Sequence, residues 1–372
     1  MPVVRCETGW HSWVILRLFV VLLCLTALCS GGTIYQITDL GAAGGSLAYR
    51  ISNSGAVVGT GFDPFNVSRG FLHDGAGLSF LPGGSESGAS GINNSGLVAG
   101  TTHAGGFARA TVWIGGAAFE LGSLGGADSY ATAVNNAGDV VGGTTDAYGR
   151  GVAFVYRNGV MEEVGAGGEW SAAYAINDSG AIAGHRMNSY GRFEAFVRQP
   201  GGGVSVIPTG GSSSYAFDLN AFGIVIGQVL TQAGYFRAFL YDGSLVFDLG
   251  TLGGSASFAY GINAGGSAVG YSWLPGNDKW HAALYEGGLV MDLNSMIVPG
   301  SGWELQEAYG INDYGQIVGV GSYQGQTRAY RLDPMFAPEA IPMVENPEPA
   351  TWVLMALPLL IIVYRSRKSI VN

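Results

Sequence analysis

INDYGQIVG, the stretch from Ile311 to Gly319, is one of seven copies of the pattern Ile-Asn-x-x-Gly-x-Val-x-Gly in this chain of 372 residues. Both glycines occur in every copy, and the second position is Asn in six copies and Ser52 in the first. Consecutive copies begin 41 to 49 residues apart. Their first residues, here termed anchors, are Ile51, Ile92, Val134, Ile176, Leu219, Ile262 and Ile311. A period of this length is typical of solenoids, propellers and other repeat arrays.

Each copy is expected to contain a tight turn between two short strands, because Asn and Gly tolerate a positive φ. An alanine stands three residues before every anchor, as Ala259 stands before Ile262. With period-two alternation, this alanine lies on one face of its strand, and the anchor and the aromatic residue Tyr260 lie on the other. Each unit then has four strands, with strand a ending at the anchor, strand b in the Gly-x-Val-x-Gly segment, strand c as in 237–241 and strand d as in 246–249.

Four short strands in about forty residues match one blade of a β-propeller, so the expected fold is an all-β, seven-bladed propeller over residues 33–333. The last unit stops at its c strand, 328–332, whereas residues 34–40 resemble a d strand without a partner in their own unit. We expect this N-terminal strand to complete the seventh blade and close the ring, which leaves no long unpaired edge. An open β-repeat array is the alternative, although it would need capping repeats, which the sequence lacks.

The composition argues against several classes of function. A net charge of −10, with only the two lysines Lys279 and Lys368, provides no basic surface for nucleic acid. All three cysteines fall in the first 29 residues, which excludes a disulfide framework or a Cys-ligated metal in the repeats. His73, His103 and His185 lack ligand spacing and are expected at surface or loop positions. We therefore predict no metal, no cofactor and no catalytic residues.

Both chain ends resemble targeting segments. The apolar run 18–28 follows two arginines and precedes small residues, so residues 1–29 are predicted to be a cleaved signal peptide, with an uncleaved anchor as the alternative. After a linker at 334–346, the segment 347–369 begins with Pro347, Glu348 and Pro349 and continues with a short apolar stretch. It ends with the basic residues Arg365, Arg367 and Lys368.

This C-terminal segment, NPEPATWVLMALPLLIIVYRSRK, resembles the PEP-CTERM sorting signal, which combines a Pro-Glu-Pro motif, a short transmembrane helix and a basic end. The resemblance implies an exosortase-type processing protease as a partner in a Gram-negative bacterium that makes exopolysaccharide. The chain would be anchored briefly in the inner membrane and then reach the cell surface or the extracellular biofilm matrix. An ordinary tail anchor is the alternative.

The repeats themselves resemble the HAF repeat family of extracellular bacterial proteins in segments such as FDLGTLGGSASFAYGINAGGSAVGYS and RAFLYDG. The eponymous His-Ala-Phe is altered here. Only His281 keeps the histidine, and arginine replaces it in four units, at Arg69, Arg109, Arg237 and Arg328. The resemblance therefore implies an extracellular location more than a particular activity.

In a propeller, the b–c and d–a connections emerge on the same face, and here they hold many aromatic residues. These are Phe62, Phe65, Tyr148, Trp170, Tyr190, Tyr235, Trp273, Trp280, Trp303 and Tyr323. Rings beside polar side chains can bind sugars, and the candidate glycan-binding residues are Trp273, Trp280, Asn277, Asp278, Trp170 and Trp303. The rings could instead pack onto their own loops. The expected function is an exported surface or matrix protein that binds exopolysaccharide without catalysis; a glycan-active propeller enzyme and a purely structural envelope protein are the alternatives.

Overall fold

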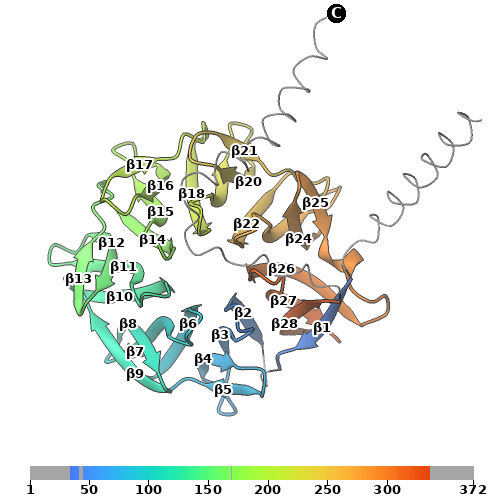
Figure 1. Ribbon diagram of the computed structural model, residues 1–372, viewed down its shortest axis with the longest axis horizontal. Helices are drawn as coiled ribbons and strands as arrows, with labels where there is room; N and C mark the ends of the chain where they lie inside the picture. Colours follow the sequence, from blue (N-terminus) through green and yellow to red (C-terminus); the bar gives the residue numbers. More distant parts are fainter. Residues whose placement is uncertain (1–33, 42–44, 169, 336–372) are drawn as a thin grey trace, which may run out of the picture. The chain divides into compact units, whose positions relative to one another are not determined.

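The computed structural model describes residues 34–41, 45–168 and 170–335, which form a ring of seven four-stranded antiparallel sheets (Figure 1). The strand nearest the centre of each blade is its a strand, and strands b, c and d follow outward. The predicted seven-bladed propeller is thus confirmed. The predicted signal peptide, the segment 347–369 and all but the first two residues of the linker lie outside the described residues.

The first four blades follow chain order. Blade 1 comprises β2 (Ser46–Ile51), β3 (Val57–Phe62), β4 (Ser68–His73) and β5 (Leu78–Phe80). Blade 2 comprises β6 (Glu86–Ile92), β7 (Val98–Ala104), β8 (Phe107–Ile114) and β9 (Ala117–Gly122). Blade 3 comprises β10 (Gly125–Val134), β11 (Val140–Asp146), β12 (Gly151–Arg157) and β13 (Val160–Glu163). Blade 4 comprises β14 (Ser171–Ile176), β15 (Ile182–Met187), β16 (Phe193–Arg198) and β17 (Val204–Val206).

The last three blades include the one assembled from both ends of the chain. Blade 5 comprises β18 (Ser213–Leu219), β19 (Val225–Leu230), β20 (Phe236–Tyr241) and β21 (Val246–Asp248). Blade 6 comprises β22 (Ser257–Ile262), β23 (Ala268–Trp273), β24 (Trp280–Glu286) and β25 (Leu289–Asp292), followed by the 3-10 turn η1 (Leu293–Met296). Blade 7 comprises β26 (Trp303–Ile311), β27 (Ile317–Tyr323), β28 (Gln326–Pro334) and β1 (Tyr35–Asp39). No helix within the described residues is long and apolar enough to cross a membrane.

The N-terminal strand closes the ring, as predicted. β1 pairs antiparallel with β28 from Tyr35 opposite Pro334 to Asp39 opposite Tyr330. Tyr35 is buried, and Leu40 is also buried and donates its backbone amide to the carbonyl of Ala329 at 3.1 Å. The closing strand therefore supplies both main-chain hydrogen bonds and apolar contacts to blade 7.

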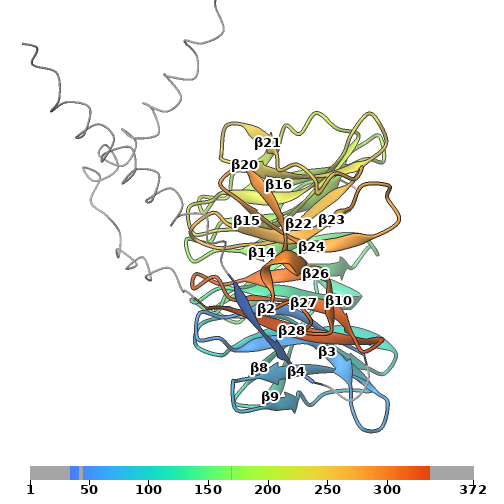
Figure 2. The same ribbon diagram turned by 90° about the vertical axis from the view of Figure 1, so that its right-hand side faces the viewer.

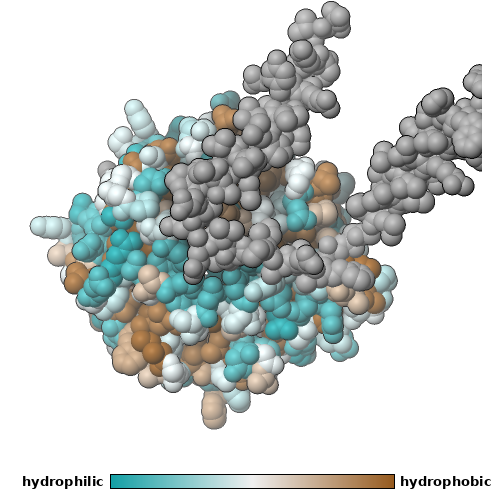
Figure 3. Space-filling view, viewed as in Figure 1, coloured by the Kyte–Doolittle hydropathy of each residue, from teal (hydrophilic) through white to brown (hydrophobic). Residues whose placement is uncertain are grey.

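The two faces of the ring differ in the connections that they carry. We term the side with the a–b turns the turn face, and the side with the b–c and d–a connections the loop face (Figure 2). Both ends of the described propeller lie on the turn face, where the amide of Met335 donates to the carbonyl of Ile34 at 2.9 Å. Figure 3 views the turn face, and hydrophilic residues make up much of its visible middle part.

The Asn-x-x-Gly turns have a second role that links the blades. In the six blades that have the asparagine, its side-chain amide donates to the backbone carbonyl of the equivalent residue in the next blade, at 2.9 to 3.3 Å. These asparagines are buried. We term this circle the Asn ring, and its members are Asn93, Asn135, Asn177, Asn220, Asn263 and Asn312. Because blade 1 has Ser52 instead, the link from blade 1 to Asn93 is missing.

Ser52→Asn is therefore expected to complete the Asn ring. The new side-chain amide would donate to the carbonyl of Asn93, and its oxygen would replace the Ser52 hydroxyl, which accepts from the amide of Ala56 at 3.2 Å. One buried hydrogen bond adds about 1 kcal/mol to the free energy of unfolding, which thermal and urea unfolding would measure. Ser54→Asn, in the same turn but outside the ring, is the control. Equal stability of the two variants would contradict a cohesive role for the ring.

The predicted alternation of the a strands is wrong, because every a strand contains a β-bulge two residues before its anchor. In blade 1 the bulge lies between Ala48 and Arg50. Ala48 and the anchor Ile51 therefore share one face and pack in one cluster with Phe71. The aromatic residue between them, Tyr49, lines the central channel instead. The bulge thus takes the aromatic residues out of the packing between blades.

The same bulge explains the second glycine of the repeat. A Cβ on Gly59 would collide with the carbonyl oxygen of Leu47, and the equivalent glycine meets the same obstacle in each of the other six blades. The a and b strands approach each other too closely there for any side chain. This glycine is therefore required by the bulge, whereas the first glycine of each copy, such as Gly55 with a φ of 82°, is required by the turn.

Candidate functional site

The loop face carries a set of exposed aromatic side chains in or beside the turns of its b–c hairpins. The exposed fractions of the three most open rings are 85% to 87%, and the other two reach 44% and 51%. We term this set the aromatic crown, and its members are Phe65, Phe107, Tyr148, Tyr190 and Tyr235. Blades 1 to 5 contribute one residue each. Phe65, Tyr148 and Tyr190 occupy equivalent positions in their turns, whereas Phe107 is the first residue of β8 and Tyr235 ends its turn. This set of exposed rings makes the loop face a candidate binding surface.

Hydrogen bonds fix the backbone of the turns that carry the three most exposed rings. Asp63 Oδ1 accepts from the backbone amide of Phe65 at 2.9 Å, Asp146 Oδ1 from that of Tyr148 at 2.9 Å, and Asn188 Oδ1 from that of Tyr190 at 3.0 Å. Each of these oxygens accepts a second hydrogen bond, from the backbone amide two residues after the aromatic residue. The three turns therefore have the same fixed geometry, which lowers the conformational entropy that a bound ligand would cost.

The predicted blade 6 residues lie together in one hairpin. Trp273 and Trp280 are cross-strand partners whose ring centroids are 5.1 Å apart, and both are partly buried. The Nε1 atom of Trp280 is enclosed without a hydrogen-bond partner. Asn277 has a φ of 58°, and its Oδ1 accepts from the amide of Ser255 at 2.7 Å, so its side chain fixes the loop. Asp278 is exposed at the tip of the hairpin.

The other two predicted residues belong to different blades. Trp170 precedes β14 of blade 4, is 43% exposed and lies 6.5 Å from the ring of Phe193. Trp303 begins β26 of blade 7 and stacks on Tyr323 at 5.0 Å. The six predicted residues thus share the loop face but do not converge on one pocket. They belong to blades 4, 6 and 7.

The central channel contains a cavity of about 360 Å³ with two chemically different sides. One side is an arc of rings whose neighbouring centroids are 5.2 to 5.5 Å apart. We term it the aromatic arc, and its members are Tyr49, Tyr174, Phe217, Tyr260 and Tyr309. The opposite side holds the hydroxyl residues Thr60, Ser90 and Thr132. The sequence showed these rings in repeat register, but the unforeseen bulge concealed that they face the channel.

One cation lines this cavity. Arg50 extends from blade 1, and its Nη1 donates to the backbone carbonyls of Tyr260 at 3.2 Å and Tyr309 at 2.9 Å, which belong to blades 6 and 7. The carboxylate of Asp218 accepts from the amides of Leu219 at 2.9 Å and Ile262 at 3.1 Å, and burial raises the pKa of Asp218. Asp218 lies near Arg50 but forms no ion pair with it.

The phenol groups around the channel stay neutral. Burial raises the pKa of Tyr174 and of Tyr260 to about 12. Burial and the hydrogen bond to Glu307 raise the pKa of Tyr309 further, and the Tyr309 hydroxyl donates to Glu307 Oε2 at 2.6 Å. These phenols can therefore stack and exchange hydrogen bonds with a ligand, but none is activated as a nucleophile.

His185 is buried among rings, which corrects the expectation of a surface or loop position. It is 3% exposed, and its ring lies 4.8 Å from Phe193, 5.1 Å from Tyr215 and 5.4 Å from Tyr174. Its Nδ1 atom has no hydrogen-bond partner. Burial lowers the pKa of His185 to about 4, so the imidazole is neutral at neutral pH.

This burial predicts a specific sensitivity to acid. The unfolded chain binds a proton at His185 near pH 6.5, and the folded chain does so only near pH 4, so stability is lost as the pH falls between these values. His185→Phe should remove about 3 kcal/mol of this loss. Urea unfolding at about pH 7 and about pH 4 measures it, with exposed His103→Phe as the control. A parallel fall in parent and His185→Phe stability would contradict the assignment.

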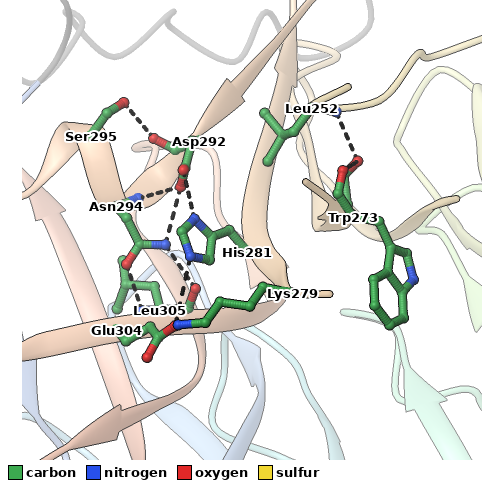
Figure 4. A network of polar contacts seen from close by, with 10 residues as sticks. Leu252, Trp273, Lys279, His281, Asp292, Asn294, Ser295, Glu304 and Leu305 are labelled. Carbon is green, nitrogen blue, oxygen red and sulfur yellow. Dashed lines mark hydrogen bonds and ion pairs between the residues drawn. The ribbon is translucent and has the colours of Figure 1, made fainter. Parts of the chain in front are cut away.

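A polar network joins strands c and d of blade 6 to strand a of blade 7 (Figure 4). His281 Nδ1 lies 2.7 Å from Asp292 Oδ2, and its Nε2 lies 3.8 Å from Glu304 Oε1, which also pairs with Lys279 Nζ at 3.2 Å. Both ring nitrogens of His281 thus face carboxylates rather than a hydroxyl nucleophile. Two other blades make the same c–d contact with arginine, in the pairs Arg237–Asp248 and Arg328–Asp39.

The network is therefore a variant of a repeated structural ion pair between strands c and d, and we assign it no catalytic role. In the described part of the chain, no three His, Cys, Asp or Glu side chains are grouped so that they could hold a metal ion. The loop face and the cavity of the central channel remain the candidate site.

One of the comparisons with known proteins supports the propeller fold. A family model described as "Protein of unknown function (DUF3466)" matches residues 155–335, just under half of the chain. The β-propeller domain of the Trilobed protease from Pyrococcus furiosus is similar, with a TM-score of 0.51, 10% identity and coverage of 84% of this chain and 99% of that chain. TolB from Acinetobacter baumannii is more distant, with a TM-score of 0.43, 14% identity and coverage of 66% and 64%. A search of curated proteins gave no match.

Proposed function

We propose that this chain is an exported, non-catalytic propeller that binds an extracellular polysaccharide on its loop face. The aromatic crown carries this proposal, because its three most exposed rings lie 85% to 87% open at the tips of hydrogen-bonded turns on one face. Exposure of such apolar rings to water is unfavourable, so a ligand that covers them would gain binding free energy. Rings held apart on separate blades suit a long polymer that contacts several of them at once.

A carbohydrate fits the chemistry of this face better than a membrane or a nucleic acid. Aromatic rings cover the apolar faces of pyranoses, and neighbouring polar groups bind the hydroxyls. Arg150 lies 5.9 Å from the centroid of the Tyr148 ring and pairs with Asp146, so donors and acceptors stand beside the crown. The acidic chain, with a net charge of −10, does not favour an anionic lipid surface or nucleic acid.

Processing at both chain ends is part of this proposal. We expect residues 1–29 to be removed as a signal peptide and an exosortase-type protease to cleave the PEP-CTERM-like segment 347–369. Intact-mass analysis of protein from the cell surface should then find neither residues 1–28 nor the basic residues 365–368. Full-length protein there would contradict the processing.

The test of the proposed function is a binding measurement combined with a product assay. The purified protein is titrated with the exopolysaccharide of its own organism, and a glycan array is used in parallel. We expect saturable binding with no release of oligosaccharides. Released products would support a glycan-active enzyme instead, and the absence of both binding and turnover would support a purely structural envelope protein.

A further inference from the structure

We propose that the central channel is a pocket for the terminal sugar ring of a polysaccharide chain. The pocket is the cavity between the aromatic arc and the hydroxyl residues Thr60, Ser90 and Thr132. The identity of the ligand class rests on the proposed function, since the aromatic crown would bind the body of the same polymer. The pocket adds a separate specificity, because it would select chain ends.

The two sides of the cavity match the two sides of a pyranose. The aromatic arc is continuous across blades 4 to 7 and blade 1, with neighbouring ring centroids 5.2 to 5.5 Å apart. Such an arc offers ring faces and edges to the C–H groups of a sugar. The hydroxyl residues of blades 1 to 3 lie opposite. A volume of about 360 Å³ falls within the range of small-molecule sites.

Arg50 supplies a free pair of donors in this cavity. Its Nη1 is fixed by the carbonyls of Tyr260 and Tyr309. Its Nε and Nη2 have no hydrogen-bond partner among the described residues, and neither atom is fully enclosed. These two nitrogens form one edge of the guanidinium, which binds two neighbouring oxygen atoms side by side. A carboxylate or two adjacent hydroxyls of a sugar ring would provide them.

Arg50 also defines the inner end of the proposed pocket. Its side chain is held by the backbone of blades 6 and 7. A second hollow of about 160 Å³ lies on the turn face, among the anchors and the Asn ring, and Arg50 is not part of its lining. In this proposal a chain end enters from the loop face and places its terminal ring between the aromatic arc and Arg50.

The repeat provides a blocking substitution that the fold should accept. Ser90 in blade 2 occupies the position of Tyr49 in blade 1. Ser90→Tyr would thus extend the aromatic arc into the cavity without new backbone geometry. Arg50→Lys is the second variant, because a lysine retains a donor for the two carbonyls but lacks the two-nitrogen edge. Both melting temperatures are compared with that of the parent, so that a folding defect is recognised.

The probes are free glucose, galactose, mannose, N-acetylglucosamine and glucuronic acid, measured by saturation-transfer NMR on the full chain. We expect at least one of them to bind the parent with millimolar affinity, and Ser90→Tyr and Arg50→Lys each to weaken it at least tenfold. Tighter binding of glucuronic acid than of glucose would identify a carboxylate as the partner of Arg50, and equal binding would identify hydroxyls.

The proposal is overturned if none of these sugars binds, or if a sugar binds equally well to the parent and to folded Ser90→Tyr. Polysaccharide binding through the aromatic crown should survive Ser90→Tyr, because the crown lies outside the channel. Loss of monosaccharide binding with retained polymer binding supports the pocket. A variant without the crown rings distinguishes the two claims. If it still binds monosaccharides, the pocket does not depend on the crown, so the proposed function can fail while the pocket stands.

Discussion

Simultaneous replacement of Phe65, Tyr148 and Tyr190 by alanine is expected to lower the affinity for the polysaccharide at least about 100-fold. Each aromatic anchor that contacts a ligand contributes about 1 to 3 kcal/mol, or about 5- to 150-fold. The free energy of unfolding should change by less than about 1 kcal/mol, because the rings are exposed and the hydrogen bonds of their turns involve the backbone. Calorimetric titration and urea unfolding measure both quantities.

The turn face provides matched controls for this variant. Phe222 is 62% exposed and Tyr314 is 43% exposed, and each follows an asparagine of the Asn ring in the same kind of turn. Phe222→Ala and Tyr314→Ala should leave the affinity unchanged. An equal loss of affinity in the control variants would mean that exposed rings bind the polymer without regard to face.

Deletion of residues 34–40 is expected to destabilise the propeller by about 3 to 6 kcal/mol and to cause aggregation. The deletion removes the buried side chains of Tyr35 and Leu40, and burial of one large apolar side chain is worth about 1.5 to 3 kcal/mol. It also exposes the edge of β28, whose main-chain groups pair with β1 from Tyr35 to Asp39 in the intact ring. Thermal unfolding and size-exclusion chromatography measure the two effects.

A circular permutant is the control for this deletion. Met335 and Ile34 are hydrogen-bonded neighbours, so residues 34–40 can be attached after Met335 through a short turn. Blade 7 would then have the connectivity of the other blades, and the permutant should recover the parent's melting temperature. A deletion variant that stays monomeric with the melting temperature of the parent would mean that the ring does not depend on its closing strand.

The sequence predicted the number of blades and the closing strand because both depend on local signals that recur. Asn-x-x-Gly fixes the a–b turn in every copy, and the unpaired d strand at 34–40 matches the missing strand after 332. Strict alternation assigned the a-strand residues to the wrong faces, because one bulge residue reverses the face of every residue that follows it. The second glycine of the repeat was the signal that could have revealed the bulge. It occurs in every copy, as Gly59 does in blade 1, because strand b meets the bulge of strand a there.

The candidate site was predicted in outline. Residues such as Tyr148 and Tyr190 were placed on the correct face because b–c loops share that face in any propeller. Asn277 was taken for a ligand-binding side chain, although a positive φ and a bond to Ser255 give it a structural role in the loop. The burial of His185 depends on rings from two neighbouring blades, and no local pattern in the sequence reports such a contact.

Hydroxyl-radical footprinting with mass spectrometry tests the binding face most directly, because it reports the exposure of each aromatic side chain with and without polysaccharide. We predict that saturating polysaccharide protects Phe65, Tyr148 and Tyr190, whereas Phe222 and Tyr314 on the turn face remain as reactive as in the free protein. Protection of the turn-face pair with no protection of the crown would contradict the loop face as the binding surface.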